Sequence, residues 1–354
     1  DPTQLGIHRA LAGGVTTIHT MHGSANSIGG QNAVLKLKFD SSPAEMLVES
    51  GPRIVKFALG ENVTRERTPA RFPNTRMGVE SVMRHAFNDA LEYRREWTRY
   101  REKNTAGQVV APLRRDLRLE ALDDILKGDL WVHSHCYRAD EILRLLTVAE
   151  DYGFRIATLQ HVLEGYRVLP EMRNHGVGGS TFSDWWSYKK EAFDAIPYNA
   201  AMMHRAGIVT SLNSDSDEVI RHLNLEAAKT LRFGGLTADE AVRLITLNPA
   251  IQIGLGDRIG SIETGKDGDL AVFNGHPLDT HSRAVMTVIE GEIFFAECGS
   301  DFASLQPGPA ARSIPAPPRP VLQIPVSKTG RYAIVGATVH PVASDPIPDG
   351  FVLI

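Results

Sequence analysis

Two hydrophobic patterns alternate along this chain. Short apolar stretches are followed by longer ones in which apolar residues recur every three or four positions. The first pattern is typical of β-strands and the second of amphipathic helices. We therefore expect strands over 15–19, 52–60, 130–135, 154–161 and 207–215, with a further short strand over 177–182.

The helical stretches lie between these strands. In the stretch 139–152 the apolar stripe ends at Gly153, a common helix stop. Thr237-Ala-Asp-Glu240 has the form of a capping box, and its helix ends before Pro249. Further helices are expected from residue 5 to Gly13-Gly14, and over 78–103, 117–127 and 194–206. Strands that alternate with helices indicate βαβ units and a parallel sheet.

The pattern changes after residue 250. Gly265-Lys-Asp-Gly268 predicts a turn, and 269–273 and 285–295 are strand-like, so 251–300 is expected to form part of a small β unit. The stretch 301–328 is rich in proline and is predicted to be a linker. Within 329–354, strands are expected over 332–340 and 350–354, as the opening of a further unit.

Composition narrows the class of protein. The 354 residues are 42% hydrophobic and 23% charged, with a net charge of -4, which argues against general nucleic-acid binding. No apolar run reaches membrane-spanning length, and two cysteines cannot form a disulfide framework. The chain opens on Asp1, so we expect a fragment or a processed chain. The cytoplasm is favoured, and a signal peptide ahead of Asp1 is left open.

Side chains able to bind a metal stand at or near the ends of four predicted strands. They are Lys56, His133 with His135, His161 and Asp215. In a parallel barrel such ends lie on one rim, the rim that carries active sites. Imidazole and carboxylate suit Zn²⁺ and similar divalent ions, which lower the pKa of a water to about 7 for hydrolysis. The partner expected is a small-molecule substrate.

Several segments resemble the amidohydrolase superfamily, in particular its imidazolonepropionase- and prolidase-like branch. The resemblance covers about residues 1–296. It is carried by Ala10-Leu-Ala-Gly-Gly-Val-Thr-Thr, Gly23-Ser-Ala-Asn, Val55-Lys-Phe-Ala-Leu-Gly, Val132-His-Ser-His, Leu159-Gln-His, Asn213-Ser-Asp, Ile245-Thr-Leu-Asn-Pro-Ala, Leu255-Gly-Asp-Arg-Ile-Gly-Ser-Ile-Glu and Gly265-Lys-Asp-Gly-Asp-Leu-Ala-Val-Phe.

The resemblance implies a TIM-type (β/α)8 barrel over 1–250 beside a small β-sandwich, with one or two divalent metals. Lys56 corresponds to a lysine that is carbamylated in two-metal members, and His133 and His161 correspond to ligands. Asp215 corresponds to a ligand and general base, and His135 is expected to contact the substrate. The family's first strand carries its own HxH pair, and this chain is expected to begin after it.

These residues also have structural interpretations, and some choices stay open. His19 and His22 are expected to be structural, and Lys56 has a buried ion pair as its alternative. The basic stretch from Arg65 to Arg76 is a solvated loop or a clamp for an anionic substrate. Trp185 and Trp186 either line a pocket or pack.

The function expected is metal-dependent hydrolysis of a non-peptide amide, cyclic amide or dipeptide-like C–N bond. A catalytically silent fragment with a binding or structural role is the alternative, as is a deaminase or esterase of the same superfamily. Whether the protein forms a homo-oligomer or is part of a tandem of two modules remains open.

Overall fold

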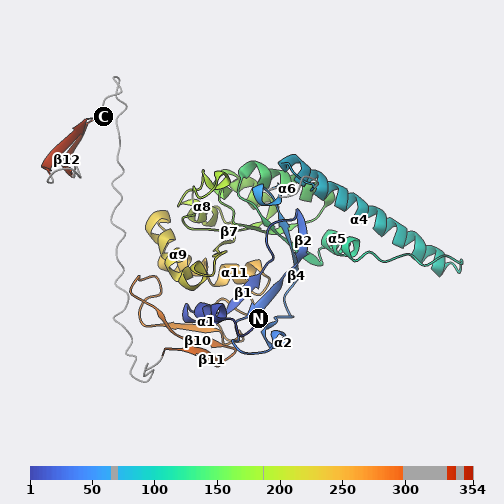
Figure 1. Cartoon of the computed structure of the whole chain (residues 1–354), viewed down its shortest axis with the longest axis horizontal. Coiled ribbons are helices and arrows are strands. Elements are labelled where there is room, and N and C mark those ends of the chain that lie inside the picture. Colours follow the sequence, from blue (N-terminus) through green and yellow to red (C-terminus); the bar gives the residue numbers. More distant parts are fainter. Residues whose placement is uncertain (65–70, 186, 298–332, 340–346, 354) are drawn as a thin grey trace. The chain divides into compact units, whose positions relative to one another are not determined.

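The protein is described by a computed structural model (Figure 1). The structure describes residues 1–64, 71–185, 187–297, 333–339 and 347–353. The chain divides into two compact units, Asp1–Arg312 and Ser313–Ile354. The whole of the predicted linker 301–328 lies outside the described residues. Among the described helices, none has the length and apolar character needed to cross a membrane.

The helices of the first unit follow the predicted order. They are α1 (Leu5–Ala12), α2 (Pro43–Met46), α3 (Glu61–Thr64), α4 (Arg76–Thr105), α5 (Leu117–Lys127), α6 (Ala139–Tyr152), α7 (Leu169–His175), α8 (Asn199–Arg205), α9 (Leu223–Lys229), α10 (Ala238–Arg243) and α11 (Leu247–Gln252).

The strand over 130–135 has its predicted bounds, and the other predicted strands of the central sheet are shorter than expected. The strands of the first unit are β1 (Thr17–Thr20), β2 (Ile28–Gln31), β3 (Ala33–Lys36), β4 (Arg53–Ala58), β5 (Leu130–His135), β6 (Ile156–Gln160), β7 (Gly178–Thr181), β8 (Thr210–Leu212), β9 (Leu270–Phe273), β10 (Ala284–Ile289) and β11 (Glu292–Ala296). The second unit has β12 (Ala333–Val339) and β13 (Ile347–Leu353), which pair antiparallel, so two strands are confirmed near the predicted positions.

A six-stranded mixed sheet forms the centre of the first unit, in the order β2-β4-β5-β6-β7-β8. The five strands from β4 to β8 run parallel, whereas β2 pairs antiparallel with β4. The predicted α/β class and the parallel strands are therefore confirmed. β2 is not among the predicted strands, because its Ile-Gly-Gly-Gln sequence has little strand propensity, and pairing with β4 overrides that preference.

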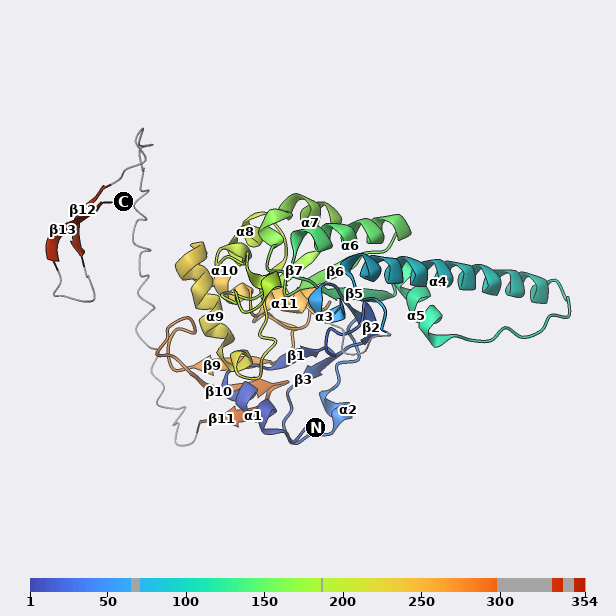
Figure 2. The same ribbon diagram turned by 45° about the horizontal axis from the view of Figure 1, so that its top comes forward.

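One face of this sheet packs against helices. Val55, Phe57 and Val132 are buried in a core shared with α4 to α8. Phe87 of α4 stacks on Phe154, with ring centroids 4.5 Å apart, and Phe57 lies 6.2 Å from Phe87. Figure 2 shows α4 and α5 running alongside each other and extending beyond the sheet.

A three-stranded antiparallel sheet, β11-β10-β9, forms the small β unit. The predicted strand over 285–295 is instead a hairpin, β10 and β11, which turns at Glu290 and Gly291, both with positive φ. α1 packs on this sheet, where the Thr287 hydroxyl donates a 2.7 Å hydrogen bond to the Leu11 carbonyl.

Lys36, the last residue of β3, links the small β unit to the rest of Asp1–Arg312. Its side chain is 3% exposed, and its Nζ lies 2.6 Å from Asp267, 3.2 Å from Asp269 and 2.9 Å from Glu290. Burial acts to lower the pKa of Lys36, but the hydrogen bonds to Asp267 and Glu290 raise it above its usual value.

Replacing Phe87 by alanine is expected to reduce the free energy of unfolding by about 3–5 kcal/mol, because the cavity would lie inside the aromatic core. Urea denaturation followed by circular dichroism would measure it. Phe193, which is 72% exposed, is the control, and Phe193→Ala should change stability by less than about 0.5 kcal/mol. Equal effects of the two substitutions would contradict this description of the core.

Lys36→Met should cost about 3–5 kcal/mol at pH 7, because it leaves the buried carboxylate of Asp269 and the partly exposed ones of Asp267 and Glu290 without their cation. Hydrogen bonds from Lys38 and Lys36 hold the pKa of Glu290 at about 2, below the unfolded value near 4.3. The stabilisation from Glu290 is therefore present above about pH 4.3 and lost as the pH falls towards 2. Thermal unfolding at pH 7 and pH 3 should show the wild-type advantage shrinking, and Lys38→Met should have the smaller effect.

Candidate active site

Register places three of the predicted site residues on one face of the sheet. β4 and β5 pair in parallel with Lys56 opposite His133 and Ala58 opposite His135. Because the intervening residues Val55, Phe57 and Val132 belong to the helix-covered face, Lys56, His133 and His135 lie on the other face. All three are buried, with 4%, 0% and 1% exposure respectively.

Both ring nitrogens of His133 are bonded to protein groups. Its Nε2 donates to the Gln252 carbonyl at 3.1 Å, and Gln160 Nε2 donates to its Nδ1 at 3.0 Å. Burial, helped by the neighbouring His19, lowers the pKa of His133 well below its usual range, so the ring is neutral. His133 was predicted to be a metal ligand. In the structure neither ring nitrogen of His133 is left without a hydrogen bond to act as a ligand beside His161 and Asp215. The ligand role stays a prediction.

His135 occupies the end of the same strand and lies beside His161. The two ring centroids are 4.9 Å apart, and the ring of Tyr137 is 4.7 Å from that of His135. Asn62 contacts His135 Nε2 at 3.2 Å, while His135 Nδ1 is buried and has no hydrogen-bond partner among the described residues. Burial, followed by the charges of His161, Lys56 and Lys189, lowers the pKa of His135 well below its usual range.

His161 and Asp215 each follow a strand in the left-handed region of backbone conformation, with φ of 60° and 43°. This is uncommon for residues other than glycine, and such strain gathers at functional sites. His161 Nδ1 lies 3.2 Å from Asn213 Oδ1, and Asn213 Nδ2 donates to Ser180 at 2.9 Å. His161 therefore carries its proton on Nδ1 and keeps the Nε2 lone pair free of a proton.

That lone pair faces a carboxylate. His161 Nε2 lies 3.8 Å from Asp215 Oδ2, and burial, partly opposed by Asp215, lowers the pKa of His161 to about 4. At neutral pH the contact is thus between two electron-pair donors, with the Asp215 side chain 57% exposed. Two ligands of one zinc ion stand roughly 3.4 Å apart at bond lengths of about 2.0–2.2 Å, so this pair fits part of a divalent-ion site. Within the described residues, no three His, Cys, Asp or Glu side chains are grouped to hold an ion.

Lys56 completes the centre of the site. Its Nζ donates to the His22 carbonyl at 2.8 Å. Burial lowers its pKa, an effect that the negative charge of Asp215 partly opposes. Because burial favours the neutral amine, Lys56 has more nucleophilic character than an exposed lysine. The described structure gives Lys56 no hydrogen bond or salt bridge to a carboxylate, in contrast to the ion pair that was its alternative.

The two histidines predicted to be structural have different surroundings. His22 bonds through both ring nitrogens to backbone groups, the carbonyl of Gly23 in its own loop and the N–H of Gly30 in β2, each at 2.8 Å. His19 lies with its ring 5.0 Å from that of His133, and its buried Nε2 has no partner in the described structure. Burial, with the nearby Lys56, lowers the pKa of His19 to about 4.

Aromatic side chains support His161. Phe182 stacks on His161 at 5.2 Å, and Trp185 stacks on Phe182 at 4.3 Å. Trp185 thus packs beside the site, whereas Trp186 lies outside the described residues. Of the basic stretch, Arg65 and Arg67 also lie outside them, and Arg71 binds Ala25 and Asn26.

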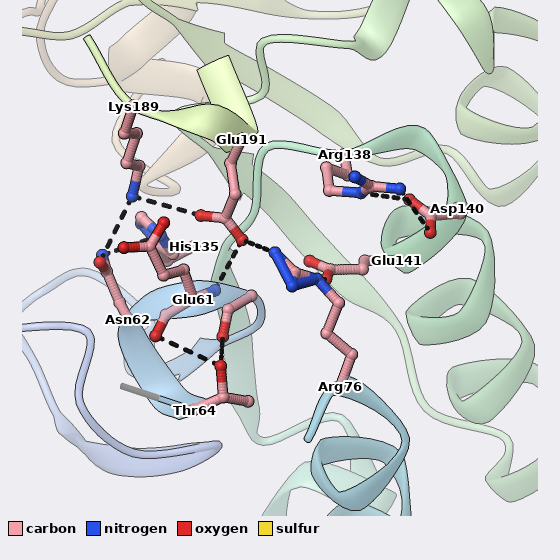
Figure 3. A network of polar contacts seen from close by, with 11 residues as sticks. Glu61, Asn62, Thr64, Arg76, His135, Arg138, Asp140, Glu141, Lys189 and Glu191 are labelled. Atoms are coloured by element: carbon pink, nitrogen blue, oxygen red, sulfur yellow. Dashed lines mark hydrogen bonds and ion pairs between the residues drawn. The ribbon is translucent and has the colours of Figure 1, made fainter. Parts of the chain in front are cut away.

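A network of charged groups lies next to His135 and was not predicted from the sequence (Figure 3). Arg76 at the start of α4 bridges Glu141 and Glu191. Glu191 also accepts the backbone N–H of Glu61 at 2.6 Å and lies 3.3 Å from Lys189. Its members come from four separate segments, so only the three-dimensional structure reveals it.

Gly60 allows two carboxylates of this network to approach the backbone. It has φ of 81°, and a Cβ there would stand 2.5 Å from Glu191 Oε1 and 3.2 Å from Glu141 Oε2. Gly128 has φ of 85° with no atom within 4 Å of the corresponding position. Gly60→Ala should therefore cost more than the roughly 1–2 kcal/mol of left-handed strain expected for Gly128→Ala. Urea denaturation of the two variants would test this, and equal losses would contradict the close approach.

Comparison with known proteins shows the family of the chain. A sequence model described as the amidohydrolase family matches residues 3–301, and the chain belongs to that family. It is 32% identical over 305 residues to the amidohydrolase tasK of Hapsidospora irregularis, a match spanning 80% of this chain and 31% of that protein.

Two further proteins are similar. The N-substituted formamide deformylase of Arthrobacter pascens is 28% identical over 182 residues, which is 46% of this chain and 32% of the deformylase. The chain thus spans about a third of each of these two curated relatives. The crystal structure of an amidohydrolase from Thermotoga maritima aligns over 84% of this chain and 76% of its own, with 32% identity and a TM-score of 0.75.

Proposed function

We propose that the protein containing this chain is a metal-dependent amidohydrolase that cleaves a C–N bond of a small non-peptide amide. In this proposal the mixed sheet belongs to a (β/α)8 barrel, and β9 to β11 belong to a small β-sandwich. The observation that best supports this proposal is the contact between His161 Nε2 and Asp215 Oδ2, two electron-pair donors 3.8 Å apart at the ends of parallel strands.

The ion, with zinc the first candidate, would be held by His161 and Asp215, together with further ligands. Lys56, as the family resemblance implies, would join them after carbamylation. When bound, such an ion polarises a carbonyl and lowers the pKa of a water to about 7. His133 would have to release Gln252 or Gln160 to become a ligand, so we rank it below His161.

The chain's own residues supply the proton transfer. Asp215 is the general base, because its carboxylate is the more exposed member of the pair, so that one oxygen can face the ion while the other accepts a proton. It then returns that proton to the leaving nitrogen. His135 contacts the substrate from the end of β5, opposite Asn62.

The substrate class rests on the relatives. The deformylase is named for an N-substituted formamide, a small amide, and it supports an amide before an ester. A panel of formamides, N-acyl amino acids, cyclic amides, dipeptides and lactones would test this choice. Release of ammonia from an aminopurine or aminopyrimidine would instead indicate a deaminase. Hydrolysis of lactones alone would indicate an esterase.

Asp215→Asn in the full-length protein should lower kcat by about 10²–10⁴, because an amide cannot accept the proton of the attacking water. It should still retain bound metal through the remaining ligands. Turnover and metal content by plasma mass spectrometry are the two measurements. His161→Ala should lose metal as well as rate, since it removes a ligand outright.

Asp217→Asn is the matched control, because Asp217 is the next carboxylate along the same loop. A kcat in Asp215→Asn above about a tenth of the wild-type value, with a large loss in Asp217→Asn, would transfer the base to Asp217. His133→Ala tests the remaining ligand: metal loss equal to that of His161→Ala would make His133 a ligand, and full occupancy would limit it to a structural role.

A further inference from the structure

A cleft of about 420 Å³ lies between α4 and α6, and its volume is within the range of small-ligand sites. Much of its wall is apolar and is formed by Leu59, Val79, Met83, Leu145 and Val148. These five side chains belong to the core on the helix-covered face of the sheet, whereas Lys56 and His133 lie on the other face. The cleft is therefore separate from the candidate active site.

One carboxylate that lines this cleft lacks hydrogen bonds. The Glu141 side chain, in the first turn of α6, is 9% exposed, and neither of its oxygens has a hydrogen-bond partner in the described structure. Arg76 stands beside it as an ion pair, but Arg76 Nε is not aligned to donate, and the guanidinium donates instead to Glu191 (Figure 3). A buried acceptor without a donor is costly, and a ligand that donates to it removes that cost.

The positive charges that line the cleft are already in use. Among the described residues of the lining, Arg76 and Arg144 are the only cations. Arg144 pairs with Glu80 at 3.6 Å, and Arg76 is shared between Glu141 and Glu191. Burial therefore raises the pKa of Glu141 to about 7, although the charge of Arg76 partly opposes this effect. A further cation beside Glu141 has to come from a ligand.

A primary amine with an aliphatic chain matches both the apolar wall and the buried acceptor. Its ammonium group carries a positive charge and three N–H donors, and its chain gains by leaving water for an apolar surface. An alcohol of the same length offers one donor and no charge. A carboxylic acid brings a negative charge towards Glu141 and Glu191, which repel it.

We propose that the cleft between α4 and α6 is a binding site for a small aliphatic primary amine, whose ammonium group donates to Glu141 and whose chain lies on the apolar wall. The site goes beyond the proposed function, because it lies on the other side of the sheet and its occupation requires neither a metal ion nor turnover.

Isothermal titration calorimetry of the full-length protein with hexylamine, 1-hexanol and hexanoate tests the ligand class. At about pH 8.5 the amine is charged and Glu141 is ionised. Because hydrogen bonds between charged groups are the stronger ones, hexylamine should bind about 10-fold or more tightly than hexanol, and hexanoate more weakly than either. From butylamine to hexylamine the affinity should rise roughly threefold to fourfold per methylene, because each one is buried against the wall.

Methionine methyl NMR locates the bound amine. In protein labelled with ¹³C-methyl methionine, the Met83 resonance is identified by its loss in Met83→Leu. This resonance should shift when hexylamine is added, because Met83 forms part of the wall of the cleft. An unchanged Met83 resonance in the presence of saturating hexylamine would place the amine elsewhere and overturn the proposal.

Glu141→Gln removes the charge while keeping the size of the side chain. Hexylamine affinity should fall about 10-fold or more, with hexanol affinity unchanged. Glu171→Gln is the matched control, because Glu171 is an exposed glutamate in the first turn of α7. Leu143→Trp, at a lining position that is 37% exposed, should fill the cleft and weaken both ligands, and it decides the matter if Glu141→Gln does not fold.

Three results would overturn the amine site. The first is equal affinity for hexylamine and hexanol, and the second is an equal effect of Glu141→Gln and Glu171→Gln. The third is an amine affinity that Asp215→Asn lowers and Leu143→Trp leaves unchanged, since this would place the amine at the candidate active site. Because binding and not turnover is measured, failure of the proposed function would leave these outcomes unaffected.

Discussion

The structure depends on satisfying polar groups on the buried inner face of a largely parallel sheet. One face is packed by helices, as parallel strands require, so any lysine or histidine on the other face must find hydrogen bonds without water. His133 does this with Gln160 and Gln252, and Gln252 in turn binds Ser211 at 2.6 Å and the carbonyl of Val209 at 2.8 Å. α11, which carries Gln252, therefore joins β5 to β7 and β8 at the side-chain level.

Towards the carboxyl ends of the strands, the hydrogen bonding of polar side chains on this face is incomplete. Deeper in the sheet His133 is fully bonded, whereas two positions later His135 retains an unpaired nitrogen. His161 and Asp215, just beyond their strands, have left-handed backbones and face each other as electron-pair donors. A fully hydrogen-bonded interior thus passes within a few residues into an edge with unpaired polar atoms, and the active sites of (β/α)8 barrels lie at the carboxyl ends of their strands.

The local pattern of apolar residues was sufficient to predict most helices and strands of the first unit and which polar side chains lie together on the sheet. The sequence placed Lys56, His133 and His135 at or near the ends of predicted parallel strands, and the strand register puts the three on one face of the sheet. Local pattern could not distinguish His133 from His135, because the difference lies in Gln252, 119 positions from His133, and in Asn62, 73 positions from His135. The Asn62–Lys189 contact joins residues 127 positions apart, and neither has a neighbour in sequence that marks it. β2 was missed for a related reason, since its glycines form a strand only beside β4.

The bond between Thr287 and Leu11 also constrains how this unit is made. It joins residues 276 positions apart, and the Lys36–Asp267 contact joins residues 231 apart. At roughly 5–20 residues per second of synthesis, α1 emerges from the ribosome on the order of 15–60 s before the strand on which it packs. During that interval its buried residues Ala10 and Leu11 lack their final partner Ile289. The end of the small β unit therefore sets the moment at which Ala10 and Leu11 can be enclosed.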